Sequence, residues 1–325
     1  MRCSGLATRL RLWLGGCSPL SFALYLKNKM NRMLILRFWD FQRICTEKAA
    51  DIIRLSDASW NNIDFSQNEP EIIRQYLINR NVGIDFLNQN LAPTLSLMGF
   101  RVKFASVFIH QKPRITRLSG DQCEIGDMLV IFSFFDRSKN PLINRAFIVQ
   151  AKKEFKIDNI CQKELYENDY EFDFPENLYT NSICCNSSPR RYWPRYWENR
   201  VRGLKYLILS EDIGPIIQFL PWDASVQASW SIIFLWTLLG NSALRFSRYP
   251  YPCWNWSAII WDLITVTGKA LTRGQERGCG INYLKSILNQ FNAFDKFHNY
   301  TKIVEGNDGG LSIMLIMVQD KEILV

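Results

Sequence analysis

The spacing of apolar and polar positions changes near residue 100 of this 325-residue chain. Before that point the spacing predicts helices, because apolar residues recur every three to four positions. One helix is expected over residues 46–55. A second begins at Asn68-Glu-Pro-Glu71, where a proline and two acids are typical of a first helical turn. A third is expected over residues 84–98 and ends at Gly99, a common helix stop.

After residue 100 the pattern favours strands, because β-branched and aromatic residues become frequent and partly alternate with polar ones. Strands are expected over residues 101–110, 127–135, 145–152, 204–209 and 311–318. A polar loop at 136–141 joins the second and third of these, which predicts an antiparallel hairpin. Two apolar, tryptophan-rich stretches, 224–239 and 256–267, are expected to be helices. The fold class is therefore α/β.

Three regions are expected along the chain: an N-terminal tail over 1–32, a core over 33–210, and a more helical C-terminal region over 211–325 packed on the core. The apolar run at 12–26 superficially resembles a secretory signal, but Pro19 interrupts it and no small-residue cleavage site follows. It is also too short to span a bilayer as a helix. We favour translation starting at Met30 or Met33, with a membrane anchor as the alternative.

The net charge and the cysteines indicate which class of partner and which cellular compartment to expect. The formal net charge is +8 and the pI is near 9.0, which suits a polyanionic partner such as nucleic acid. The nine cysteines are irregularly spaced and odd in number, so we expect reduced thiols in a cytoplasmic protein without a membrane partner. With only two histidines, a structural zinc site is not expected.

Candidate chemistry lies in Cys123-Glu-Ile-Gly-Asp127 and, further along, Gln150-Ala-Lys152. Side chains two positions apart on a strand share a face, so Gln150 and Lys152 project together. If the hairpin forms, Asp127 enters one strand beside Gln150 on the next. A carboxylate, an amide oxygen and an ammonium in one area could hold Mg²⁺ or Mn²⁺ and act on a phosphodiester. Lys152 would orient water or stabilise charge on the phosphate.

Auxiliary groups surround this trio in the sequence. Glu124 offers a second carboxylate if the chain bends at Gly126, and Glu71 could add another from a distance. The alternative is a purely structural role, in which Asp127 caps a turn and Lys152 and Lys153 end a strand in solvent. A basic and aromatic run, Arg190-Arg-Tyr-Trp-Pro-Arg-Tyr-Trp197, could grip phosphates and stack bases, or could be a surface loop whose aromatic rings pack inward.

The order of a helix, a strand, Glu124-x-Gly-Asp127 opening a second strand and Gln150-x-Lys152 closing a third resembles the PD-(D/E)xK superfamily of restriction-endonuclease-like proteins. The resemblance covers residues 68–165. Gln150 stands where an acid is usual, as in a branch that resembles methylation-dependent restriction enzymes. Gln162 resembles the polar residue that some members place on the following helix. A solvated helix face is the alternative there.

The resemblance implies a restriction-endonuclease-like mixed sheet flanked by helices. It also implies a Mg²⁺- or Mn²⁺-dependent endonuclease that cuts DNA, in bacterial restriction or anti-phage defence, with homodimerisation open. Asp127, Glu124 and Gln150 would hold the metal, while Lys153, Arg190, Arg191 and Arg195 would contact DNA. Because an amide binds a dication more weakly than a carboxylate does, the alternative is a nuclease-like fold that binds nucleic acid or serves as a scaffold without cutting.

Overall fold

A computed structural model describes residues 36–97, 99–109, 113–138, 141–157, 159–175, 188–247, 255–272 and 310–321. The chain divides into two units, Met1–Arg43 and Ile44–Val325. The described part of the first unit, residues 36–43, is helical. The apolar run at 12–26 lies outside the described residues. Among the helices that are described, none has both the length and the apolar character needed to cross a bilayer.

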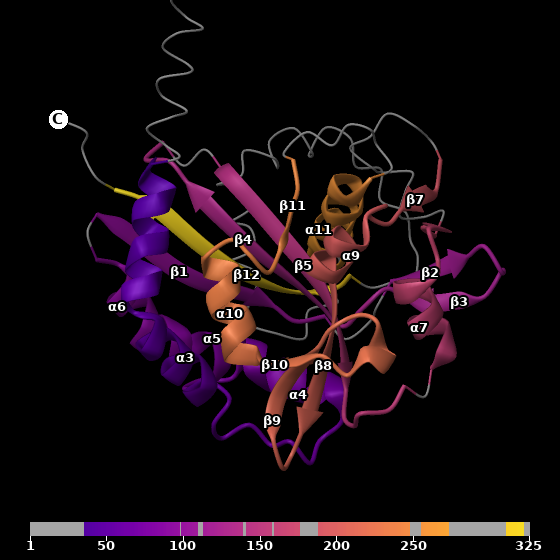
Figure 1. Cartoon of the computed structure of the whole chain (residues 1–325), viewed down its shortest axis with the longest axis horizontal. Helices are drawn as coiled ribbons and strands as arrows, with labels where there is room; N and C mark the ends of the chain where they lie inside the picture. The colour runs from indigo at the N-terminus through magenta and orange to yellow at the C-terminus, as the bar shows by residue number, and fades with distance from the viewer. Residues whose placement is uncertain are drawn as a thin grey trace, which may run out of the picture. The chain divides into compact units, whose positions relative to one another are not determined.

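A mixed sheet of eight described strands forms the centre of the second unit (Figure 1). Its strand order is β1-β12-β4-β5-β8-β9-β10, and β11 also pairs with β5. The strands are β1 (Phe100–Val107), β4 (Met128–Phe135), β5 (Pro141–Lys152), β8 (Leu204–Ser210), β9 (Gly214–Gln218), β10 (Gln227–Ser229), β11 (Leu244–Arg245) and β12 (Ser312–Asp320). The expected α/β class is confirmed.

The hairpin predicted between residues 127 and 152 is present. Strands β4 and β5 pair antiparallel, with Met128 opposite Val149, and β5 then pairs in parallel with β8. Every residue of β4 is buried, because helices and loops cover both faces of the sheet. This double burial explains why β4 reads as a continuous apolar run rather than an alternating one.

The C-terminal strand β12 lies inside the sheet, between β1 and β4 (Figure 1). It runs antiparallel to β1 and parallel to β4. The region predicted from residue 211 as more helical and packed on the core also supplies strands to the central sheet. Residue 211 lies in the turn that joins the antiparallel strands β8 and β9, and residues 312–320 supply a central strand of the same sheet. An apolar strand carries no sequence signal of which neighbours it will pair with, so this insertion was not foreseen.

Helices cover the sheet and connect its strands. Those of the second unit with described bounds are α3 (Ala49–Ala58), α4 (Glu69–Ile78), α5 (Gly83–Phe86), the π-helix η1 (Leu87–Leu91), α6 (Ala92–Leu95), α7 (Ile160–Glu167), α9 (Trp197–Gly203), the 3₁₀ helix η2 (Trp222–Ala224), α10 (Trp230–Leu238) and α11 (Trp256–Thr272). The helix predicted over 84–98 is present as one continuous helical run of three consecutive segments from Gly83 to Leu95, and its middle segment has π-helical hydrogen bonding. Pro93 enters at the third of these, and a proline within a helix removes one backbone hydrogen bond.

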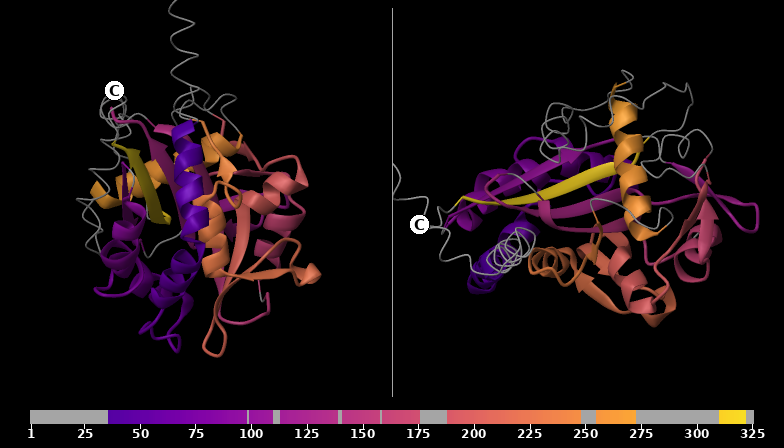
Figure 2. Two further views of the ribbon diagram at one scale, coloured as in Figure 1. Left: turned by 60° about the vertical axis from the view of Figure 1, so that its left-hand side comes forward. Right: turned by 90° about the horizontal axis from the view of Figure 1, so that it is seen from above.

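The sheet has two covered faces. On one, Trp60 stacks on Tyr76 with ring centroids 3.9 Å apart, and Trp230 of α10 meets both rings edge-on. Helix α10, drawn in orange in Figure 2, packs on α3. On the other face, the core includes residues of α7, α11 and a small sheet. The strand order of that small sheet is β3 (Gln122–Glu124), β2 (Arg114–Arg117), β6 (Glu171–Asp173) and β7 (Arg190–Tyr192).

Candidate functional site

The β4–β5 hairpin brings Asp127 and Gln150 into direct contact. Asp127 N donates to Val149 O at 2.8 Å, which fixes Asp127 at the start of β4 opposite Gln150. Gln150 Nε2 donates to Asp127 Oδ2, and Ala151 N donates to the same oxygen at 2.7 Å. The two residues are only 5% and 2% exposed. The carboxylate is therefore held by one side chain and one backbone amide in a largely dry setting.

Lys152 completes the trio from the same face of β5. Its Nζ donates to Gln162 Oε1 at 2.7 Å. Gln162 is buried on α7, the helix that follows β5. The N-terminus of α7 is capped by Asn159, whose side chain accepts a hydrogen bond from Gln162 N. The ammonium group is thus hydrogen-bonded to a helix side chain. The alternative in which Lys152 ends a strand in solvent does not describe this arrangement.

The bend before Asp127 depends on Gly126. A Cβ built on this glycine would lie 2.4 Å from Ile148 Cγ2 and 3.2 Å from the Tyr166 hydroxyl. Tyr166 is fully buried and donates to Ile125 O at 2.9 Å, which holds the segment between β3 and β4 against α7. Burial is the main cause that raises the Tyr166 pKa well above its usual value, so the hydroxyl keeps its proton as a donor.

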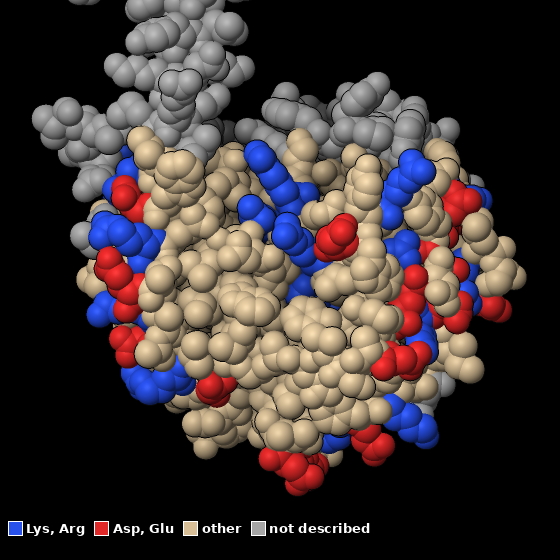
Figure 3. All heavy atoms as spheres, in the orientation of Figure 1, with Lys and Arg blue, Asp and Glu red and all other residues tan. Residues whose placement is uncertain are grey.

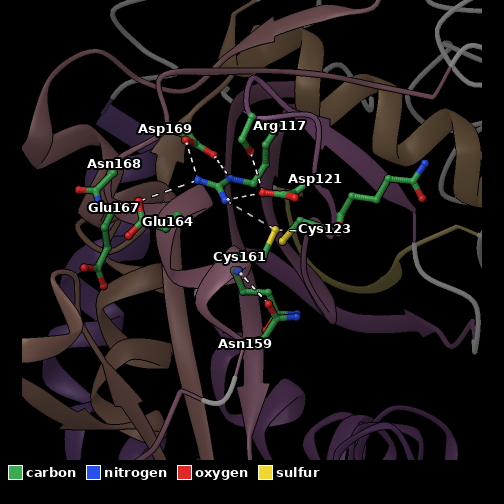
Figure 4. A network of polar contacts seen from close by, with 12 residues as sticks. Arg117, Asp121, Cys123, Asn159, Cys161, Glu164, Glu167, Asn168 and Asp169 are labelled. Carbon is green, nitrogen blue, oxygen red and sulfur yellow. Dashed lines mark hydrogen bonds and ion pairs between the residues drawn. The ribbon is translucent and has the colours of Figure 1, made fainter.

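A polar network centred on Arg117 fixes α7 to the small sheet (Figure 4). Arg117 Nη2 donates to Asp169 Oδ1 at 3.1 Å, just after the end of α7. The same guanidinium lies 3.9 Å from Glu164 and donates to Cys161 Sγ at 3.8 Å, both on α7 itself. The Asp169 hydrogen bond is the main cause that raises the pKa of Arg117. Because Cys161 precedes Gln162, this network also determines where Lys152 is held.

The two predicted auxiliary acids lie on different elements, and Glu71 is engaged by a neighbour on its own helix. Glu71 pairs with Arg74 on its own helix, with Nε–Oε2 at 2.6 Å. Glu124 lies on β3, opposite Arg114 in the register. The acid of α4 that reaches β5 is Glu69, whose Oε1 accepts a hydrogen bond from Lys153 N at 3.3 Å. Glu69 and Glu71 share the first turn of one helix, and helical spacing alone does not tell which of them faces the sheet.

Lys153 and Arg190, both predicted to contact DNA, are engaged by other residues of the protein. Lys153 Nζ bonds to Phe65 O and, at 3.0 Å, to Gln67 O, so it ties the chain before α4 to the end of β5. Arg190 pairs with Asp173 at 2.6 Å and with Glu171 at 2.9 Å.

Arg191 requires a correction, because it is 2% exposed and pairs with Asp262 of α11 at 2.6 Å. A buried, paired guanidinium does not contact DNA in this arrangement. The end of the run is open: Arg195 is exposed, and Tyr196 and Trp197 are 69% and 42% exposed. The first half of the run therefore packs inward and its second half faces solvent, while contact of the run with phosphates and bases stays a prediction.

The donor set fits a single, weakly held dication. The Oε1 atom of Gln150 is buried and accepts no hydrogen bond within the described part of the chain, and it belongs to the residue that contacts the Asp127 carboxylate. A hard cation takes such oxygens as ligands. Binding would require the Gln150 amide to turn, because its nitrogen now faces Asp127. Among the described residues, no three His, Cys, Asp or Glu side chains form a metal-binding cluster, so tight binding by protein ligands alone is not expected.

Comparison of the chain with models of protein families, with curated proteins and with solved structures found no match. The role of the site must therefore be inferred from its own residues.

Proposed function

We propose that this chain is a metal-dependent phosphodiester hydrolase that cuts DNA. The observation that supports this most directly is the contact between the Asp127 carboxylate and the Gln150 amide on adjacent strands, with Lys152, two residues further along β5, held by Gln162 at 2.7 Å. This is the constellation that the resemblance to PD-(D/E)xK proteins implies. The net charge of +8 is compatible with a polyanionic substrate.

In this proposal Asp127 and Gln150 supply the protein's oxygen ligands to Mg²⁺ or Mn²⁺. The bound cation would polarise the phosphate and lower the pKa of a coordinated water. The chain's own residues orient the remaining groups. Ala151 N fixes Asp127 Oδ2, and Gln162 directs the Lys152 ammonium, which then stabilises negative charge on the phosphate. Glu69 ties the first turn of α4 to the end of β5, beside this site.

A cleavage assay tests the proposal. Supercoiled DNA is incubated with the protein in Mg²⁺ or Mn²⁺, and nicking is compared between the parent, Asp127→Asn and Asp57→Asn. Asp57 is an exposed acid on α3 and serves as the matched control. We expect cleavage by the parent and the control, and loss of at least about 100-fold in Asp127→Asn. Cleavage by Asp127→Asn at the parent rate would contradict the proposal, as would inactivity of the parent with every divalent cation.

A second candidate function is nucleic-acid binding or scaffolding without cleavage. Its support is the direct hydrogen bond between Gln150 and Asp127, in which the amide nitrogen rather than the amide oxygen faces the carboxylate. The same assay separates the two candidates, since this one predicts no cleavage together with binding of labelled DNA. Unchanged thermal stability in Mn²⁺ would also favour it.

A further inference from the structure

Three arginines from three separate elements gather on the face of the sheet opposite the proposed metal site. Arg145 lies on β5, Arg245 is its antiparallel register partner on β11, and Arg202 lies on α9, which packs against both strands. Arg145 is an odd number of residues from Gln150 on the same strand, so their side chains point to opposite faces. They are also separated by roughly 17 Å along the strand. The arginine cluster is therefore a separate place in the fold.

No carboxylate among the described residues pairs with these three guanidinium groups. The ion pairs of the described residues include none that involves Arg145, Arg202 or Arg245. The nearest acid in sequence on α9 is Glu198, which is exposed and forms no ion pair with Arg202. Arg145 Nη1 donates to Ala243 O at 3.3 Å, while its buried Nε has no hydrogen-bond partner among the residues that the structure describes. Within the described part of the chain, the positive charge is therefore not compensated by an ion pair.

The charges act on one another. After burial, the charges of Arg245 and Arg202 are the causes that lower the pKa of Arg145. A buried lysine, Lys205, donates to Val201 O and Arg202 O, both at 2.9 Å, which ties down the end of α9. Figure 3 shows Lys and Arg side chains, in blue, gathered between the positions that α10 and α9 occupy in Figure 1. Like charges held together raise the free energy of the fold unless an anion neutralises them.

We propose that Arg145, Arg202 and Arg245 form a binding site for a phosphate group. A guanidinium presents a planar fork of donors that matches phosphate oxygens, and three forks from three elements can meet several oxygens of one group. A nucleic-acid backbone and free phosphate offer the same oxygens, so both have the chemistry that this site would bind. The proposal does not depend on the nuclease function, because the cluster shares no residue with the Asp127 site.

The test uses the full chain and inorganic phosphate as the probe. Thermal unfolding is measured in sodium phosphate and in sodium chloride at equal ionic strength. We expect phosphate to raise the Tm of the parent and of Asp127→Asn, and to have no such effect on Arg202→Gln/Arg245→Gln. The matched control is Arg80→Gln/Arg114→Gln, which removes two exposed arginines that form no ion pair with the described residues. This control should respond as the parent does.

A second measurement distinguishes the sources of phosphate. Anisotropy of a labelled 12-nucleotide single strand is followed in EDTA, where no cleavage can occur. If the ligand is a nucleic-acid backbone, the Arg202→Gln/Arg245→Gln protein binds the strand about tenfold more weakly per arginine removed. If only inorganic phosphate depends on these arginines, the site binds free phosphate. The proposal is overturned if this variant matches the parent with both probes or if the parent responds to neither probe. It is also overturned if the Arg80→Gln/Arg114→Gln control loses as much of the Tm response or of the strand affinity as the variant does.

Discussion

Lys152 Nζ donates to Gln162 Oε1 across 2.7 Å, from the end of β5 to the first turn of α7. This hydrogen bond makes Gln162 a positioning residue for the ammonium group. We expect Lys152→Met to lower the rate of DNA cleavage about 100-fold, because charge stabilisation at the phosphate is lost. Gln162→Leu should lower it about tenfold, because Lys152 remains but is no longer directed.

Two controls accompany this prediction. Gln162→Glu keeps an acceptor for Lys152 and should retain cleavage close to the parent. None of the three variants should alter the Tm shift caused by Mn²⁺, because neither residue is a proposed metal ligand. Equal cleavage by Gln162→Leu and the parent would show that the hydrogen bond has no positioning role.

Gly126→Ala should destabilise the fold by about 1–3 kcal/mol, because the added methyl group would overlap Ile148 Cγ2. The measurement is urea denaturation. Gly120→Ala is an informative comparison, since a Cβ there meets no atom within 4 Å and only the positive φ of +90° opposes it. We also expect Gly126→Ala to impair cleavage, because the displaced loop carries Asp127. An unchanged unfolding midpoint would mean that the segment between β3 and β4 adapts without cost.

Arg191→Met should cost about 3–5 kcal/mol of stability, because it leaves the buried Asp262 carboxylate without the guanidinium that faces it at 2.6 Å. The double variant Arg191→Met/Asp262→Leu should be more stable than Arg191→Met alone, since it removes both buried charges. Urea denaturation of the two proteins checks this. If Arg191→Met is as stable as the parent, the ion pair with Asp262 does not stabilise the fold, and Arg191 is again a candidate for contact with nucleic acid.

Stability should depend on pH through Lys205. Burial lowers the pKa of Lys205 to about 7 from the usual 10.5, so the unfolded chain binds this proton more tightly than the folded protein does. The folded state therefore gains stability as the pH rises from 7 towards 9, by up to about 1.4 kcal/mol per pH unit. Lys205→Met should lose this gain, while thiols and phenols that also titrate contribute equally to both proteins. Parallel curves of unfolding free energy against pH would contradict this assignment.

The sequence predicted the hairpin and the meeting of Asp127 with Gln150, because strand periodicity fixes which side chains share a face. It did not predict that β12 would lie between β1 and β4, since an apolar strand buried on both faces does not specify its neighbours. It selected Glu71 where Glu69 reaches the sheet, because both acids fit a first helical turn. It grouped Arg191 with exposed arginines, because Asp262, its partner, lies on α11, far away in the chain.

The arginine cluster illustrates the same limit. Arg145, Arg202 and Arg245 are far apart in the sequence, and no motif links them. They meet only because β11 returns to pair with β5 and α9 ends beside both strands. Pairings between distant segments are set by the whole sheet, so residues that such pairings bring together are visible only in the folded structure.

The direct test of the central claim is the response of Gln150→Glu to Mn²⁺, measured by thermal unfolding. Without metal, this variant sets two carboxylates side by side in a buried place and should lose about 1–3 kcal/mol of stability. With Mn²⁺ the second carboxylate becomes a stronger ligand than the amide, so the Tm should rise more than in the parent, and Asp127→Asn should not respond. The same Mn²⁺ response in all three proteins would contradict a cation site at Asp127 and Gln150.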